Sequence, residues 1–229
     1  MLSQCTQQWT TRLAAAFAVL GLSAAAAASA AAQTAAGEAY GAYVQTPEAS
    51  QAKSPLAVLP SVGPGSGDMA EASGEALSVL GAFSSDLLTS VTSGAVGAGT
   101  AGAQSVATVA EVSILSGLIT ASRVFAVTST SRSGSTTISN AYGSTFENLR
   151  VSGVSIADNV APNTRISLPG VGYVVLNEQV QHATGITVNM IHVVLQAVTG
   201  GECTSLECLP EVTATVGEII VGSASSSVR

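Results

Sequence analysis

The sequence predicts an all-β protein, a β-sandwich of about eight or nine mostly antiparallel strands. Apolar and polar residues alternate through residues 149–156 and 166–175, which is the two-residue period of strands with one buried face. The alternation shifts by one residue at Gly153, which indicates a bulge or a tight turn. A stacked β-solenoid is the alternative, because residues 112–121 resemble one of its rungs. No fixed repeat period appears in the chain, and this favours the sandwich.

Composition indicates a single exported domain with an uncharged surface. Of the 229 residues, 9% are charged and 47% are hydrophobic, and Ser, Thr and Gly fill most polar positions. The formal net charge is -7, and loss of Arg12 with a leader leaves 6 basic against 14 acidic residues, or -8. Such a chain repels phosphate backbones and anionic lipids, so nucleic acid is not an expected partner.

The first 32 residues have the three-part pattern of a secretory signal peptide. Arg12 precedes the apolar residues 13–22, and an alanine run follows with cleavage candidates at 28–30 and 30–32. A lone transmembrane helix is the alternative, but the apolar stretch is short and only weakly hydrophobic. Cys5 lies before this stretch, whereas the cysteine of a lipoprotein cleavage site lies after it. We therefore expect a signal peptide at 1–32, a single β domain at 33–229 and no membrane span after removal of the leader.

Two cysteines remain in the mature chain, Cys203 and Cys208. An even pair at short spacing in an exported protein predicts a disulfide that closes a small loop. Half of a metal site is the alternative. No histidine or second cysteine pair stands nearby, so neither a metal nor any other cofactor is expected.

The first part of the domain is predicted as two strands and their connections. Residues 38–45 form the first strand, and the polar residues 46–53, which include Pro47, form a loop. Residues 55–62 form a second extended piece punctuated by prolines, which sheets confine to edges and ends. A glycine-rich turn follows at 63–67.

Residues 68–88 fit either a helix or strands. Apolar residues recur there at helical spacing, and Asp68 with Glu71 resembles a capping box. Gly74, Gly81 and the β-branched residues that follow oppose a helix. We predict strands and loops.

Residues 97–102 formally match the dinucleotide fingerprint Gly-x-Gly-x-x-Gly. No acidic residue follows at the distance that a ribose contact needs, so a hairpin loop at 94–102 is predicted instead. The long strands 104–115 and 118–130 then form a hairpin around Ser116 and Gly117. Strict alternation places the side chains of one face at Val106, Thr108, Ala110, Val112 and Ile114, and Ile119, Ala121, Val124 and Val127 follow with a phase shift.

The second half of the domain continues with further strands. A Ser/Thr/Gly loop is predicted at 131–140, and residues 143–179 supply two or three strands. Another strand follows at 185–198, and the last lies at 218–223 after the cysteine loop.

Four ordered stretches resemble the bacterial choice-of-anchor P family: residues 113–121, 143–154, 161–178 and 220–224. The most specific parts are Pro-Asn-Thr at 162–164, Leu-Pro-Gly-Val-Gly at 168–172 and Leu-Asn-Glu-Gln at 176–179. The resemblance implies an exported, extracellular β domain without catalytic residues to carry over. This chain departs from anchored members, because only Ala-Ser-Ser-Ser-Val-Arg follows Ser223, and covalent surface attachment is therefore not expected.

Catalytic residues are sparse. His192 is in phase with Ile186 and Val188, which predicts an inward-facing structural histidine, and His182 is expected in a solvated polar loop. The carboxylates are scattered, and a sequence does not show which of them converge: Glu147, Asp158, Glu178 and Glu218. No serine-nucleophile elbow is present, so no catalytic residue is assigned.

We expect a non-enzymatic exported protein, either secreted or held at the cell surface or envelope, with a structural or interaction role. Its weakly charged strands suggest self-association or binding to a surface polymer. The alternative is a secreted carbohydrate-binding or adhesive module, for which Tyr142 and Tyr173 are the candidate ligand-binding residues. A hydrolase is a third hypothesis, and it requires His182 or His192 to lie in a cleft beside a carboxylate or a serine.

Overall fold

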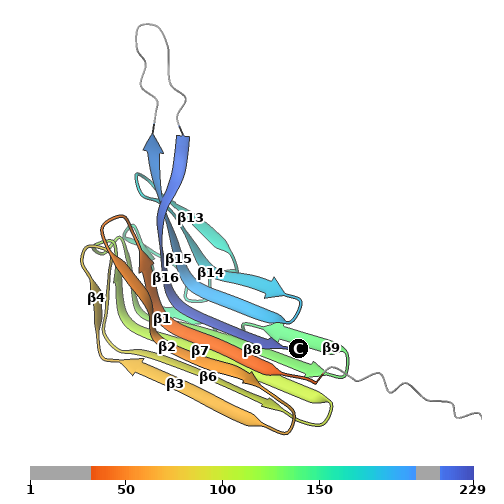
Figure 1. The fold of residues 1–229 in the computed structure, drawn as a ribbon. Coiled ribbons are helices and arrows are strands. Elements are labelled where there is room, and N and C mark those ends of the chain that lie inside the picture. Colours follow the sequence, from red (N-terminus) through yellow and green to blue (C-terminus); the bar gives the residue numbers. More distant parts are fainter. Residues whose placement is uncertain (1–31, 200–211) are drawn as a thin grey trace, which may run out of the picture. The chain divides into compact units, whose positions relative to one another are not determined.

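The computed structural model describes residues 32–199 and 212–229, which form two antiparallel sheets packed face to face (Figure 1). The predicted all-β sandwich is confirmed. This described part of the chain contains 16 strands and no helix. The number exceeds the expected eight or nine because residues 67–88 and 143–182 are each divided into several short strands.

The first sheet has six strands, and its two edges are a short strand and a proline-bearing strand. Its order is β13 (Thr164–Leu168), β14 (Gly172–His182), β15 (Gly185–Thr199), β16 (Val212–Val228), β1 (Ala35–Gln45) and β2 (Ser50–Val62). Pro55 and Pro60 lie in the edge strand β2, as the sequence predicted. This strand begins at Ser50, so the loop predicted at 46–53 is too long by four residues.

The second sheet has ten strands arranged around one long hairpin. Its members are β3 (Gly67–Gly74), β4 (Leu77–Val79), β5 (Phe83–Ser85), β6 (Leu88–Val96), β7 (Thr100–Ile114), β8 (Ile119–Ser133), β9 (Thr136–Asn140), β10 (Thr145–Glu147), β11 (Arg150–Val151) and β12 (Val154–Ser155). Strands β7 and β8 pair along their whole length, which confirms the predicted hairpin. Strands β5 and β6 line the free side of β7, and β9, β10 and β11 line the free side of β8.

Two ambiguous regions have clear outcomes. Residues 68–88 are strands and connections rather than a helix, as predicted, and residues 97–99 form the turn of the β6–β7 hairpin. The loop predicted at 131–140 is wrong, because β8 continues to Ser133 and turns at Gly134 into β9. Threonine is β-branched and suits an extended backbone, so a Ser/Thr-rich composition does not by itself indicate a loop.

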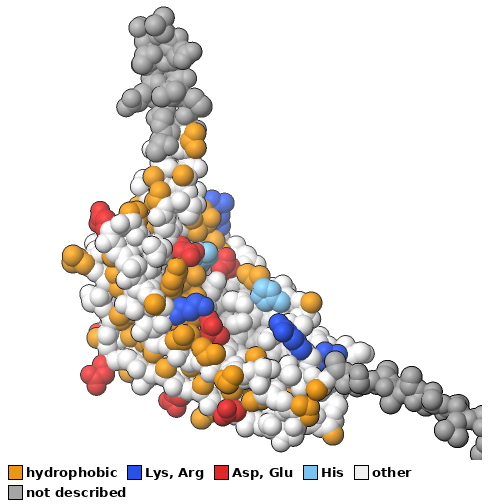
Figure 2. Space-filling model, viewed as in Figure 1, with side chains coloured by type: hydrophobic (Ala, Val, Ile, Leu, Met, Phe, Trp, Pro, Cys, Tyr) orange, Lys and Arg blue, Asp and Glu red, His pale blue; other side chains and the backbone are white. Residues whose placement is uncertain are grey.

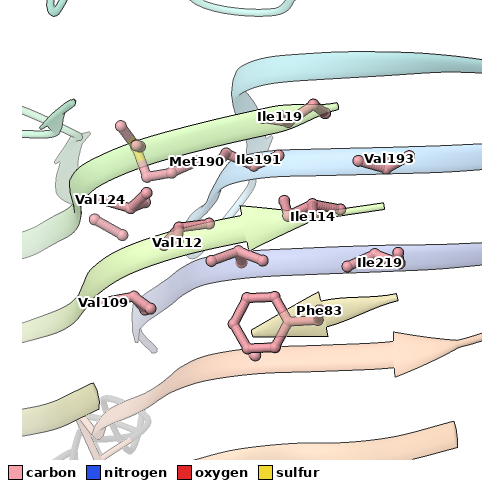
Figure 3. Close-up of a cluster of buried hydrophobic side chains, with 14 of the residues drawn as sticks. Phe83, Val109, Val112, Ile114, Ile119, Val124, Met190, Ile191, Val193 and Ile219 are labelled. Carbon is pink, nitrogen blue, oxygen red and sulfur yellow. The ribbon is translucent and has the colours of Figure 1, made fainter. Parts of the chain in front are cut away.

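The core lies between the two sheets. Side chains from β7 and β8 point toward those from β15 and β16, with Phe83 packed beside them (Figure 3). Each of these side chains is at most 2% exposed; the group includes Val112, Ile114, Ile119, Ile191, Val193 and Ile219. Burial of such aliphatic residues contributes about 1.5–3 kcal/mol each relative to exposure.

Strands of both sheets bend at one level. On the two sides of this level, opposite faces of the same strand point toward the core. In the six-stranded sheet the ladder places Gly41, Gly222, Met190 and Asn177 in one row, and Gly222 and Asn177 have φ of +66° and +50°. In the ten-stranded sheet Glu111 of β7 has φ of +49° at the corresponding irregularity. Figure 1 shows β7 and β16 bending. A residue with positive φ interrupts the two-residue alternation, so inward and outward positions exchange.

This change of face corrects the predicted face of β7. Before Glu111 the inward residues of that strand are Ala107 and Val109, and after it they are Val112 and Ile114. The predicted face of Val106, Thr108, Ala110, Val112 and Ile114 is therefore wrong in its first three members, which are partly exposed.

Near one end of the sandwich, hydroxyl groups join the sheets beside a smaller buried apolar cluster that includes Ala35, Leu59 and Ala103. The Thr92 and Ser105 hydroxyls lie 2.8 Å apart, and Ser105 Oγ donates to the backbone oxygen of Ser225 at 2.6 Å. Gly37 leaves the space that these groups occupy, since a Cβ at this position would lie 2.1 Å from Thr92 Oγ1. The two sheets approach closely there because one of them lacks a side chain.

Candidate functional site

The stretch 143–154 anchors one side of the candidate site to the core. Phe146 and Leu149 are buried, while Asn148 between them has φ of +53°. Asparagine tolerates this left-handed conformation because its short side chain can bond locally, and its Nδ2 donates to Ser122 Oγ at 3.2 Å. The shift predicted at Gly153 is the tight turn between β11 and β12. This stretch therefore fixes the segments that border the site.

Two of the three distinctive sequence motifs contact each other. Asn163 of Pro-Asn-Thr and Asn177 of Leu-Asn-Glu-Gln both have positive φ, and the backbone N–H of Asn163 donates to Asn177 O at 2.9 Å. The Asn163 side chain accepts from the N–H of Gln179 at 2.8 Å, and Asn177 Nδ2 donates to Val160 O at 3.0 Å. These four residues hold the segment before β13 against β14, and we call them the asparagine clasp.

A polar cleft of about 380 Å³ opens beside the asparagine clasp. The end of β9 and the loop after it line one wall, and β14 with residues 159–162 lines the other. Asparagine and glutamine amides dominate the lining, and Tyr142 contributes an aromatic ring that is 85% exposed. The main polar and aromatic residues are Ser139, Asn140, Tyr142, Asn159, Gln179 and Gln181.

The two predicted ligand-binding tyrosines do not lie together. Tyr142 lines the cleft, whereas Tyr173 pairs with Val194 across β14 and β15, on the face turned away from the second sheet. We call this the outer face of the six-stranded sheet. Arg165 stacks on the Tyr173 ring with its guanidinium carbon 3.7 Å from the ring centroid. That ring face is thus occupied by the chain itself.

His192 lies on the outer face between two carboxylates. Its Nδ1 is 3.0 Å from Glu178 Oε2, and its Nε2 is 3.1 Å from Glu218 Oε2. The prediction that His192 faces inward is wrong, because the row of irregularities at Met190 changes the face of β15 before His192 is reached. Of the four scattered carboxylates, Glu178 and Glu218 converge on His192, while Glu147 pairs with Arg123 instead.

The carboxylates perturb the titration of this group. The hydrogen bond and the charge of Glu178 raise the pKa of His192 above its ordinary value, and they outweigh burial, which acts in the opposite direction. The hydrogen bond from His192 in turn lowers the pKa of Glu178. Both shifts favour the ion pair, so this arrangement stabilises a charged histidine.

The polar contacts continue across the outer face. Asn189 Nδ2 donates to Glu178 Oε2 at 2.7 Å, and Asn189 Oδ1 accepts from Ser223 Oγ at 2.8 Å. Beyond Ser223, burial raises the pKa of Tyr40. The Lys53 ammonium lies 4.9 Å from the centre of the Tyr40 ring and forms an ion pair with Glu38 of β1. These contacts tie β14, β15 and β16 together, and the pair of Lys53 and Glu38 ties β1 to β2. Figure 2 shows acidic, basic and histidine side chains near one another on the face that it presents.

These polar contacts do not resemble a hydrolytic site. Both ring nitrogens of His192 face carboxylates, so neither is directed at a nucleophile or a substrate. His182 is exposed at the end of β14 rather than in the predicted loop, and its Nε2 is 3.3 Å from Thr187 Oγ1. Among the described residues, no group of three or more His, Cys, Asp or Glu is arranged to hold a metal ion.

The remaining predictions concern segments outside the described residues. Cys203 and Cys208 lie in 200–211, and the predicted signal peptide falls on 1–31 apart from its last residue. In the described ranges, no helix is long and apolar enough to cross a membrane.

Sequence reasoning missed the cleft amides and the contact between Asn189 and Ser223. A signal for part of the cleft was present, because Gln179 and Gln181 alternate on one face of a strand.

No protein-family model matches this chain, and neither curated proteins nor solved structures gave a match. The resemblance to the choice-of-anchor P family stays a prediction.

Proposed function

We propose that this chain is an exported, non-enzymatic β protein of the cell surface or envelope, with a structural or interaction role. The observation that carries the proposal is the pairing of its ionisable side chains with one another. His192 is held between Glu178 and Glu218, and Lys53 pairs with Glu38. These groups brace neighbouring strands, whereas catalysis requires an acid or base directed at a substrate.

The edges of the six-stranded sheet bear on the kind of partner. One edge strand, β2, contains two prolines, which lack the N–H that strand pairing needs, and the other, β13, has five residues. Both features discourage edge-to-edge pairing of sheets. At these two edges they disfavour self-association, which favours a surface polymer as the partner there.

A carbohydrate-binding or adhesive module is a second candidate. One observation favours it, namely that an exposed aromatic ring, Tyr142, stands at a cleft lined by uncharged amides. Aromatic rings with a polar tip suit partners that are apolar on one side and hydrated on the other.

Fractionation of the native host tests the first proposal. The intact chain is followed through cytoplasm, envelope and medium, with the N-terminus of each fraction sequenced. We expect a chain cleaved near residue 32 in the envelope or the medium. A chain confined to the cytoplasm with an intact N-terminus would contradict export.

A double His182→Gln, His192→Gln variant tests the non-enzymatic role. The variant should keep any cell-surface phenotype of the native chain, because neither imidazole is assigned a chemical step. Loss of that phenotype in a variant that circular dichroism shows to be folded at the assay temperature would favour the hydrolase hypothesis.

A further inference from the structure

The cleft exists because β14 extends past the part of its sheet that the second sheet covers. Gln179 and Gln181 pair with Val188 and Ile186 of β15, so all four side chains lie on the same, inward face. The two β15 residues are fully buried, whereas Gln179 is partly exposed and Gln181 is exposed. The inner face of β14 is therefore polar and open to solvent at the point where that of β15 is apolar and covered.

The polar groups of the cleft are held in place before any ligand arrives. Gln179 Nε2 donates to Asn177 Oδ1 at 3.0 Å, and the asparagine clasp fixes the backbone on either side. On the opposite wall, the Tyr142 N–H donates to Asn140 Oδ1 at 3.2 Å. Preorganised groups lose little conformational entropy on binding, which favours affinity.

The amides of the cleft keep hydrogen-bonding capacity for a ligand. Within the described residues, the side chains of Asn159 and Gln181 make no hydrogen bond to protein groups, although each offers two donors and an acceptor. A sugar hydroxyl also donates and accepts. An amide wall therefore matches a polyhydroxylated ligand better than it matches an ion of either sign.

The charge of the site and of the chain restricts the ligand to neutral molecules. Among the residues that the structure describes, no Asp, Glu, Lys, Arg or His lines the cleft. A charged ligand would lose hydration there without gaining a counter-charge. The net charge of -7 also disfavours acidic polysaccharides through long-range repulsion.

Tyr142 supplies the apolar part of the site. Its ring is 85% exposed, whereas most large apolar side chains of the domain are buried. A flat ring at the mouth of a polar cleft offers a surface for the C–H face of a pyranose, while the amides are placed to bind its hydroxyls. The volume of about 380 Å³ is within the range of small-ligand sites.

From these observations we infer that the cleft between the β9–β10 loop and β14 binds a neutral oligosaccharide, with Tyr142 stacking on a sugar ring and Gln179, Gln181 and Asn159 bonding its hydroxyls. This inference rests on the second candidate function and specifies its ligand class.

The test is a titration of the mature chain with defined sugars. Isothermal titration calorimetry uses cellohexaose, mannohexaose and chitohexaose as neutral probes, and hexagalacturonate as an acidic one. We expect binding of at least one neutral probe and none of the acidic probe. Tyr142→Ala should weaken that binding about tenfold or more, since truncation of a tyrosine that contacts a ligand commonly costs this much affinity. Tyr142→Phe, which keeps the ring, should retain it.

The controls separate the site from the fold. Tyr173→Ala makes the same substitution on the outer face and should leave sugar affinity unchanged. Gln181→Ala removes an amide with no protein partner, and it should weaken binding without lowering the melting temperature.

Three results would overturn the inference: no neutral probe binds, the acidic probe binds as tightly as a neutral one, or the affinity for the bound sugar is unaffected by Tyr142→Ala. In each case the first proposal is judged separately by fractionation. A chain that reaches the envelope but binds no sugar would leave the surface role standing and remove only the glycan site.

Discussion

Gly37→Ala tests the close approach of the two sheets. The added Cβ would lie 2.1 Å from Thr92 Oγ1 and 2.6 Å from Ser105 Oγ. Both hydroxyl groups are fully buried, so neither can move into solvent. The Thr92 hydroxyl can withdraw only by rotation of χ1, which breaks its contact with Ser105.

The expected cost follows from these contacts. Overpacking a tight interior position costs about 1–3 kcal/mol, and loss of a buried hydrogen bond adds about 1 kcal/mol. We expect a loss of about 2–4 kcal/mol in the free energy of unfolding, measured by urea denaturation. For a domain of this size the melting temperature should fall by roughly 5–15 °C.

A matched control isolates the steric cause. Gly102→Ala makes the same change in β7, where an added Cβ meets nothing within 4 Å, and it should be neutral or slightly stabilising. Adding Thr92→Ala to Gly37→Ala removes the nearest atom, so the double variant should lose less stability than the sum of the single ones. If Gly37→Ala were as stable as Gly102→Ala, the sheets would not approach as described.

Three further predictions concern the outer face, the asparagine clasp and the cysteines. The pKa of His192 is raised from 6.5 and that of Glu178 is lowered from 4.5, so their pairing stabilises the fold most between these two values. The loss of stability caused by His192→Gln should therefore be largest near pH 5–6. It should shrink as the pH rises through the folded-state pKa of His192, and also as the pH falls through that of Glu178. A loss of stability that does not change with pH in urea denaturation would contradict the pairing. Asn177→Ala should be about 1 kcal/mol less stable than Asn177→Gly in the same assay, because both lose the side-chain bonds and only alanine resists φ of +50°; equal stabilities would refute the strain. Thiol titration of the denatured mature protein should find no free thiol, since Cys203 and Cys208 are predicted to be bridged, and two free thiols would reject the disulfide.

The fold class was predictable because strand periodicity is local. Alternation of apolar and polar residues predicts most strands, and the prolines of β2 predicted its place at an edge. The face of β7 was not predictable, because Glu111 adopts φ of +49° and nothing in its own residue type indicates a left-handed position. Once the alternation shifts at such a residue, every inward assignment before or after it is reversed.

The site was predictable only in part. Tyr142 was singled out as a candidate ligand-binding residue, and the two motifs that form the asparagine clasp were recognised as distinctive. The convergence of Glu178, His192 and Glu218 depends on strand pairing between residues 14 and 26 positions apart, which no local pattern encodes. The cleft likewise depends on β14 extending past the cover of the second sheet, which is a property of tertiary packing.

Side-chain amide resonances report sugar binding at the individual residues of the cleft. In a ¹⁵N-labelled mature chain, titration with the same neutral hexasaccharides should shift the side-chain NH₂ signals of Asn159, Gln179 and Gln181, together with the backbone signal of Tyr142. The side-chain signal of Asn189, which lies on the outer face, should stay in place. Shifts confined to the outer face, or no shift with any neutral sugar, would contradict the assignment of the cleft as a glycan site.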